Sequence, residues 1–326
     1  MARTSAELDQ LRMMTKVARL YHSRGMVQTE IAQTLGLSQA RVSRLLTAAS
    51  DAKIIRTVVV VPEGLNTDLE EQLEEMFSLI EVHVVDMAGE NEEQLTEVLG
   101  TTIASVFQIM PIDGKNIGFT SWSRSLRALV IHLQKFQHAS ARSIIEMLGG
   151  VGPPTVQHEA AIATQRLSKL TGAAPLFLRV PGVTATPQIR DDILENDPHA
   201  RLCLEGLSQL DVALVGIGNC EIVSPLVAGD NFFSEAQFAM AKSLGAVGEI
   251  NLRFIDSAGK PISSELDDLV IGITLDQLKA TERRIGVAGG ASKHAATLAV
   301  VRGGWVNVLV TDTETAEYLL EHGANS

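Results

Sequence analysis

Cysteine is nearly absent from this sequence of 326 residues, in which Cys203 and Cys220 are the only two and no Cys-x-x-Cys pair occurs. A disulfide framework or a structural zinc site needs more thiols at closer spacing, so neither is expected. The eight histidines show no His-Glu-x-x-His or other ligand spacing. The residues therefore give no support for a metal site.

Long hydrophobic runs are missing as well. The longest run of Val, Ile and Leu, Val58 to Val61, is far shorter than the roughly 20 residues that a membrane span needs. The first residues, MARTSAELDQLR, lack the apolar core of a signal peptide. With 45% hydrophobic residues and no low-complexity tract, the chain can still build a large core. We expect a soluble, cytoplasmic protein with no membrane partner.

The net charge of −12 conceals an asymmetry along the chain. Of the 27 Lys and Arg and the 39 Asp and Glu, residues 1–60 hold nine and four, so the remainder holds 18 and 35. A basic head suits contact with phosphate backbones, and an acidic body discourages non-specific binding.

A helix-turn-helix pattern occupies residues 28–47, QTEIAQTLGLSQARVSRLLT. Small Ala32 stands where the two helices would cross, and Gly36 stands at the tight turn, where glycine most easily adopts a positive φ. Ser38 is placed to cap the second helix, and Val42 and Leu45 would form its buried face. DNA binding is therefore predicted for a first domain over residues 1–61.

The outward positions of this segment carry suitable chemistry, since Arg pairs with guanine, Gln with adenine, and Ser with phosphate. The candidate DNA-binding residues are Gln28, Thr29, Ser38, Gln39, Arg41, Ser43 and Arg44. Which arginine reads a base stays open at this point. The alternative is a helical hairpin that binds protein or dimerises, with its arginines in solvent.

The segment 56–64, RTVVVVPEG, is β-rich and predicts the wing or exit strand of a winged helix. An acidic amphipathic helix is expected over 66–79, as a connector that packs on the next domain or on a second copy of the chain.

A second domain is predicted over 62–326, where short apolar runs alternate with helical patterns. The expected strands are 80–85, 116–119, 143–148, 176–180, 211–217, 270–273, 285–289 and 306–310. This alternation predicts an α/β fold, a mostly parallel, doubly wound sheet covered on both faces.

Such sheets bind ligands at the carboxyl ends of their strands. Four glycine- or serine-rich loops follow expected strands, at 118–125, 149–154, 216–219 and 288–293. Each alone is more often a simple turn, but four at one sheet edge indicate a small-molecule pocket. None is a G-x-G-x-x-G dinucleotide loop or a P-loop, so no nucleotide cofactor is expected.

The candidate effector-binding residues are Ser121, Trp122, Ser123, Ser125, Gly149, Gly150, Glu249 and Lys293. Lys293 would begin a helix, where the dipole disfavours a cation unless an anion binds there too. The alternative is a solvated surface lysine. Glu249 is a candidate partner for a hydroxyl or ring oxygen.

Five segments together resemble a known family of bacterial transcriptional regulators. They are 30–46 (EIAQTLGLSQARVSRLL), 121–126 (SWSRSL), 211–218 (DVALVGIG), 245–250 (GAVGEI) and 285–312, which begins IGVAGGASKHAATLAVVRGG. The whole chain resembles the sorbitol-operon repressor (SorC) type, to which the central glycolytic-gene repressor and the deoxyribonucleoside-operon repressor also belong. The resemblance implies a body similar to sugar-phosphate isomerases and deaminases, a phosphorylated sugar effector, and tetramers on operator DNA.

Carried onto this sequence, the resemblance makes Ser121 to Ser125 the phosphate loop, with Ser123 in place of the family's glycine. Glu249 stands where many members have Asp, and Lys293 matches the lysine that meets the effector. Leu148 replaces an arginine that binds a second phosphate in the glycolytic repressor. A monophosphate, a free sugar or a polyol is therefore expected rather than a bisphosphate.

These observations predict a sugar-responsive transcriptional regulator, a repressor of a carbohydrate or polyol catabolic operon, that is not an enzyme. One alternative is a sugar-phosphate isomerase or deaminase with a DNA-binding head, although only His294 beside Lys293 offers a proton-transfer partner. A second alternative is a constitutive DNA-binding scaffold whose body binds nothing.

Overall fold

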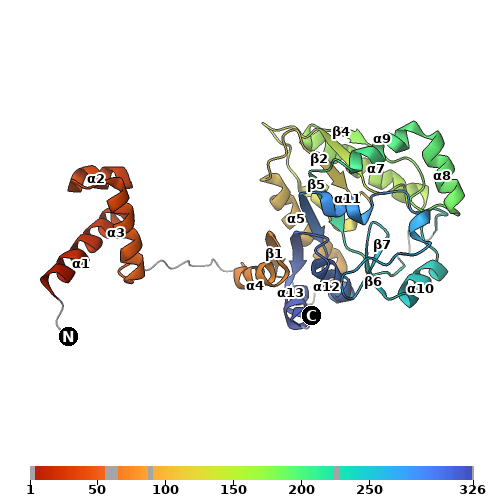
Figure 1. Ribbon diagram of the computed structural model, residues 1–326. Helices are drawn as coiled ribbons and strands as arrows, with labels where there is room; N and C mark the ends of the chain where they lie inside the picture. Colours follow the sequence, from red (N-terminus) through yellow and green to blue (C-terminus); the bar gives the residue numbers. More distant parts are fainter. Residues whose placement is uncertain (1–3, 56–64, 87–90, 223–225, 227, 325–326) are drawn as a thin grey trace. The chain divides into compact units, whose positions relative to one another are not determined.

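The computed structural model describes residues 4–55, 65–86, 91–222, 226 and 228–324. The chain divides into two compact units, Met1–Pro62 and Glu63–Ser326 (Figure 1). The β-rich segment expected at 56–64 lies outside the described residues.

The N-terminal unit is a small helical bundle. Its elements are α1 (Ser5–Ala18), a π-helical turn (Arg19–Ser23), α2 (Gln28–Leu35) and α3 (Gln39–Asp51). Gly36 ends α2 with φ +65, and the Ser38 hydroxyl caps α3 by accepting from the Arg41 amide at 3.3 Å. Val17, Ile31 and Val42 are fully buried between the helices. The turn and the buried face agree with the helix-turn-helix pattern in the sequence.

The larger unit contains a seven-stranded sheet in which every pairing is parallel. Its strands are β1 (Glu81–Val85), β2 (Asn116–Phe119), β3 (Ser143–Glu146), β4 (Ala174–Leu176), β5 (Val212–Gly216), β8 (Arg283–Val287) and β9 (Val308–Asp312). They lie in the order β1-β9-β8-β5-β2-β3-β4.

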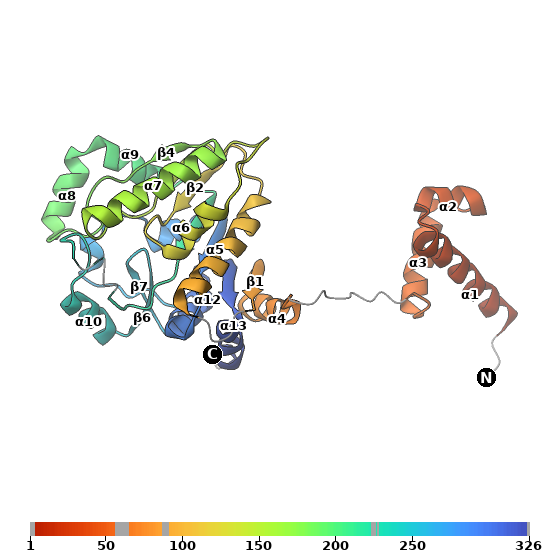
Figure 2. The same cartoon turned by 180° about the vertical axis from the view of Figure 1, so that it is seen from behind.

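Helices cover both faces of this sheet (Figures 1 and 2). One face carries α5 (Glu92–Gln108), α6 (Arg124–His132) and α7 (Pro154–Thr171). The other face carries α4 (Thr67–Phe77), α9 (Pro198–Leu207), α11 (Leu275–Ala280), α12 (His294–Arg302) and α13 (Thr313–Gly323). The expected α/β architecture, a mostly parallel sheet between two helical layers, is confirmed. No helix in the described ranges combines the length and apolarity needed to cross a membrane.

A smaller hairpin, β6 (Ala246–Ile250) and β7 (Arg253–Asp256), forms a separate antiparallel sheet. α10 (Glu235–Ser243) packs against β6, and the remaining elements are α8 (Pro187–Asn196) and two 3₁₀ turns, Asp267–Leu269 and Ala291–Lys293. A hydrophobic core separate from those on the two faces of the large sheet packs against the hairpin. It contains four phenylalanines, Phe232, Phe233, Phe238 and Phe254.

The strands expected at 285–289 and 306–310 are β8 and β9, each displaced by two residues, and three further expected strands were wrong in extent or in kind. The strand expected at 176–180 is β4, which ends at Leu176, and β3 stops at Glu146 rather than at residue 148. Residues 270–273 make only isolated bridges, Val183 with Val270 and Leu148 with Gly272. These segments lie beside the carboxyl edge of the sheet, where apolar residues are buried by loops instead of by strand pairing.

The acidic helix expected at 66–79 is α4, and it packs along the free edge of β1. The amides of Val82 and Val84 point away from β9 and donate to the carboxylates of Glu74 and Glu70, each at 2.9 Å. Leu73 is fully buried beneath the helix. The helix thus covers an edge strand whose amides would otherwise lack partners.

Candidate functional site

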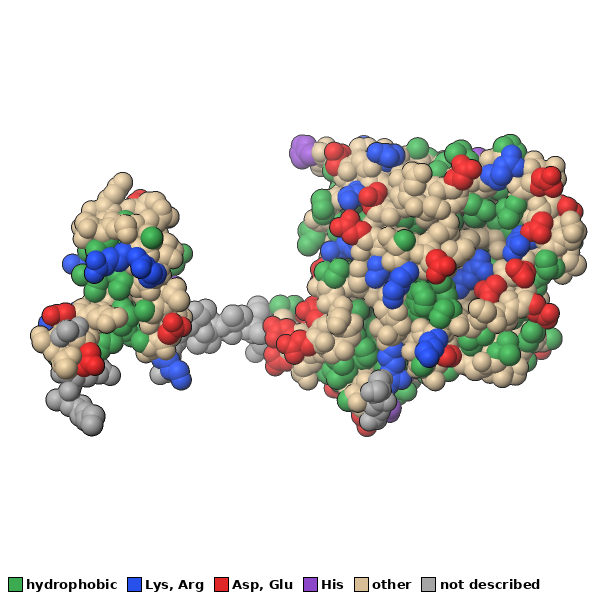
Figure 3. All heavy atoms as spheres, viewed as in Figure 1, with side chains coloured by type: hydrophobic (Ala, Val, Ile, Leu, Met, Phe, Trp, Pro, Cys, Tyr) green, Lys and Arg blue, Asp and Glu red, His purple; other side chains and the backbone are tan. Residues whose placement is uncertain are grey.

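The exposed face of α3 carries the predicted DNA-binding side chains. Arg41, Ser43, Arg44 and Gln39 are exposed, whereas Val42 between them faces the core. Within the described ranges neither guanidinium has an ion pair, and the Arg44 Nε donates only to the Ala40 carbonyl at 3.3 Å. Figure 3 shows a band of Lys and Arg side chains on the N-terminal unit. The arginines of α3 are therefore free to meet phosphates or base edges.

The remaining DNA-binding candidates lie at helix starts. Thr29 is exposed and Gln28 half-buried in the first turn of α2. Ser38 is exposed but its hydroxyl already caps α3. Their contacts with DNA stay predictions.

In the larger unit, the direction in which successive strands are added to the sheet reverses between β2 and β5. From β2 the chain continues to β3 on one side, and from β5 it continues to β8 on the other. The crevice outside such a switch point is where open α/β sheets bind ligands. Gly216 at the end of β5 leaves room for Ser123, because an added Cβ would lie 2.8 Å from the Ser123 Oγ.

The loop after β2 leads straight into α6. The amide of Arg127 makes the first bond of this helix, to the Ser123 carbonyl at 2.9 Å. The amides of residues 124–126 therefore precede the first helical bond, as at any helix start. Ser125 lies in this first turn and is half-buried. Such a turn can bind an anion.

Glu249 reaches the same edge from the β6–β7 hairpin. Its backbone pairs with Gly218, which follows β5, through two hydrogen bonds of 2.9 and 3.0 Å. Its carboxylate accepts from the Leu252 amide at 2.6 Å and is buried, and a side chain at Gly218 would collide with it. Burial raises the pKa of Glu249 to about 7, although the Leu252 hydrogen bond and the charge of Lys293 act in the opposite direction.

Lys293 is the cation that faces Glu249. It is half-buried, at the end of the 3₁₀ turn that follows β8, and α12 begins at His294. Burial lowers the pKa of the Lys293 ammonium, and the carboxylate of Glu249 opposes that shift. The structure thus brings Glu249 and Lys293 together near the ends of β5 and β8.

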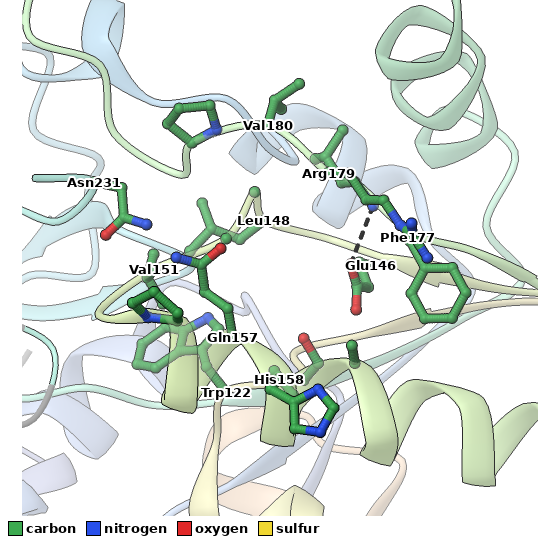
Figure 4. A pocket seen from close by; sticks show the side chains of 18 residues that line it. Trp122, Glu146, Leu148, Val151, Gln157, His158, Phe177, Arg179, Val180 and Asn231 are labelled. Atoms are coloured by element: carbon green, nitrogen blue, oxygen red, sulfur yellow. Dashed lines mark hydrogen bonds between the residues drawn. The ribbon is translucent and has the colours of Figure 1, made fainter. Parts of the chain in front are cut away.

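The other sequence candidates lie in a neighbouring cavity of about 560 Å³ (Figure 4). Ser121, Trp122, Gly149 and Gly150 line it, whereas Ser123, Ser125, Glu249 and Lys293 do not. The eight predicted residues therefore divide into two groups, four that line this cavity and four that do not.

Sequence reasoning missed the polar residues that complete this cavity. They are Glu146, Gln157, His158, Arg179 and Asn231. Glu146 gave a usable signal, because it is the only charged residue in its strand, follows two isoleucines and stands at the carboxyl end. The other four lie in a helix or in loops with no motif.

Replacing Glu249 by Gln is expected to remove part of the pH dependence of stability. Because the pKa of Glu249 rises from 4.5 to about 7 on folding, the folded state binds more protons between these pH values. The free energy of unfolding therefore falls as the pH rises through this window. The neutral amide, which can still accept from Leu252, should make the variant more stable above pH 7 by on the order of 1–3 kcal/mol.

Urea unfolding at pH 5 and pH 8 measures this effect, with exposed Glu317→Gln as the matched control. The natural protein and Glu317→Gln, which both keep Glu249, should lose stability from pH 5 to pH 8 relative to Glu249→Gln. Parallel pH profiles for all three would contradict the assignment.

Comparisons with known proteins place both units in one class. Residues 62–321 match the sugar-binding domain family (Sugar-bind). The chain is 29% identical over 318 residues to the sorbitol operon regulator of Klebsiella pneumoniae, covering 96% of this chain and 99% of that protein. It is 30% identical over 306 residues to the deoxyribonucleoside regulator of Bacillus subtilis (strain 168), covering 94% and 96%.

The fold is shared as well. The crystal structure of full-length SorC from Klebsiella pneumoniae superposes with a TM-score of 0.68 at 28% identity, covering 95% of this chain and 98% of that one. The fold and these matches define a transcriptional regulator with a sugar-binding domain, and not an enzyme. The chain belongs to the sugar-binding domain family of SorC-type regulators.

Proposed function

We propose that this regulator is a cytoplasmic repressor of a carbohydrate or polyol catabolic operon, released from its operator by a phosphorylated sugar. The N-terminal unit binds DNA through α3, with Arg41, Arg44, Gln39 and Ser43 facing the duplex. The observation that carries the proposal is the presence, in one chain, of this exposed arginine face and of polar side chains gathered at the switch point of the sheet, among them Glu249 and Lys293. The relatives named as regulators of a sorbitol operon and of deoxyribonucleosides support the choice of operon class.

The effector's phosphate binds at the start of α6. The first-turn amides and the hydroxyls of Ser123 and Ser125 surround it, and Lys293 supplies the positive charge. Glu249 accepts a hydrogen bond from a sugar hydroxyl. The remainder of the ligand extends past Ser121 and Trp122 toward Gly149 and Gly150, which line the cavity.

The protein acts as a homo-oligomer, a tetramer in which effector binding favours one arrangement of the DNA-binding units. The effector can shift this equilibrium only by its differential affinity for the two arrangements. Analytical ultracentrifugation with and without DNA measures the oligomeric state.

Fluorescence anisotropy of a duplex from the gene's own upstream region tests the proposal. Protein is titrated in the presence and absence of a pooled panel of sugars, polyols and their phosphates. Saturable, salt-sensitive binding that the pool weakens is the expected result. Binding that the pool leaves unchanged contradicts the sensing role and favours a constitutive scaffold, and tighter binding contradicts release from the operator.

A further inference from the structure

Two walls of the cavity of about 560 Å³ consist of residues that do not belong to the proposed phosphate site. Gln157 and His158 reach the cavity from α7, and the segment 177–181 forms the facing wall (Figure 4). Its volume falls within the roughly 300–1,000 Å³ typical of small-molecule sites. It therefore has room for a ligand portion that extends beyond the crevice at β2 and β5.

Two buried polar atoms in this lining lack hydrogen-bond partners within the described residues. One is the Trp122 Nε1, a donor, and the other is the Asn231 Oδ1, an acceptor. Buried polar groups are otherwise almost always paired, because an unpaired one loses its hydration without compensation. A hydroxyl group both donates and accepts, so a polyhydroxyl ligand can satisfy both atoms.

Glu146 lies toward the other end of the cavity, near Phe177 and Arg179 (Figure 4). One carboxylate oxygen accepts from Thr164 Oγ1 at 2.8 Å, and the other accepts from the Leu178 amide at 3.0 Å. Ser121 is a third hydrogen-bond partner of this carboxylate, and the lone pairs that remain can accept from a ligand hydroxyl. Only 8% of the residue is exposed, so water cannot replace these bonds freely.

The charge at this end of the cavity disfavours an anion. Burial raises the pKa of the Glu146 carboxyl, against the hydrogen bonds from Thr164, Leu178 and Ser121 and the charge of Arg179. A second negative group beside it would therefore bind only together with a proton or against repulsion. The positive charge of Arg179 offsets only part of this effect, since the residue is exposed and its guanidinium packs over the Phe177 ring at 5.1 Å.

We propose that this cavity holds an uncharged, hydroxyl-bearing end of the effector, and that Glu146 selects that end against a second phosphate or a carboxylate. The inference rests on the proposed function, which places the single phosphate at the start of α6. The effector class is thus a sugar or polyol monophosphate whose far end is neutral.

Calorimetric titration with matched ligand pairs tests this selection. The pairs are fructose 6-phosphate with fructose 1,6-bisphosphate, glucose 6-phosphate with 6-phosphogluconate, and ribose 5-phosphate with ribose 1,5-bisphosphate, accompanied by hexitol and pentitol monophosphates. Within any pair that binds, the added anion should weaken binding at least about tenfold. Glu146→Ala should weaken monophosphate binding by about tenfold, as expected for lost hydrogen bonds to a charged or buried group.

Glu146→Gln guards against a folding defect in the alanine variant, because the amide oxygen can still accept one of the two native hydrogen bonds. In each pair, this variant should lower the ratio between the affinity for the monophosphate and the affinity for the doubly anionic partner. Glu205→Ala, at an exposed position on α9, is the control and should bind as the natural protein does.

The two indole N–H resonances locate the ligand. Monophosphate binding should shift that of Trp122, while that of Trp305, which donates to the Gly259 carbonyl at 2.8 Å, serves as the reference. The inference is overturned if the doubly anionic partner binds equally well, if the Trp122 signal does not move, or if both Glu146 variants bind unchanged. If no panel member binds the natural protein, the proposed sensing function fails first, and this inference with it.

Discussion

Replacement of Lys293 by alanine is expected to abolish the effector response while leaving DNA binding intact. Lys293 is half-buried opposite Glu249 at the end of the 3₁₀ turn that follows β8, and in the proposed site its ammonium would contact the effector's phosphate. A hydrogen bond to a charged group contributes about 1.5–3 kcal/mol. The affinity for the effector should therefore fall by at least about tenfold, so that the effector concentration that releases the operator from the natural protein no longer does so.

Operator anisotropy with increasing effector measures this shift. Lys135→Ala, at an exposed lysine after α6, removes the same charge away from the crevice and should respond normally. Thermal unfolding of the variant without effector separates a binding defect from a folding defect. A normal response of Lys293→Ala at unchanged effector concentration would show that the phosphate binds elsewhere.

The helix-turn-helix could be read from sequence because its determinants are local. The Ser38 hydroxyl caps an amide only three residues away, and Gly36 contributes its own positive φ. Both residues therefore define the turn through local interactions that do not depend on the rest of the chain. Helical spacing then places Val42 inward and Arg41 and Arg44 outward. The predicted turn and the predicted inward and outward helix positions agree with the structure because they depend only on these local interactions.

The body was predictable as a class of sheet, and its ligand edge followed from the rule that parallel strands end at one side. The division of the candidate residues into two groups was not predictable. It depends on the strand order, which places β5 beside β2 and therefore brings Ser123 close to Gly216. Such pairings join residues about a hundred positions apart, which no local pattern encodes.

The β6–β7 hairpin was missed for a more specific reason. Its two-residue turn, Asn251 and Leu252, has φ values of +50 and +62. Turns of this kind normally show glycine at one of these positions, and leucine there is strained. A distant partner helps to hold the turn, since Asn251 accepts from Thr120, and within the hairpin Leu252 donates to the Glu249 carboxylate. A local conformation that nonlocal contacts impose leaves no signal in its own sequence.

The second large effect is expected in the N-terminal unit. Arg41→Ala and Arg44→Ala should each weaken operator binding by about 1–3 kcal/mol, and the double variant should approach non-specific affinity. Both side chains are exposed on α3 and have no ion pair within the described residues, so their removal should cost little folding free energy. Arg12→Ala is the control, because Arg12 lies on α1 and pairs with Asp9.

Salt dependence distinguishes the two roles that the sequence left open. A variant that loses a phosphate contact should bind all sequences more weakly and lower the slope of log K against log salt by about 1. A variant that loses a guanine contact should instead relax discrimination at one operator position. Titrations of both variants with natural and singly mutated operators, at several salt concentrations, assign each arginine. Unchanged affinity in both would remove α3 from the DNA interface, and with it the role proposed for the N-terminal unit.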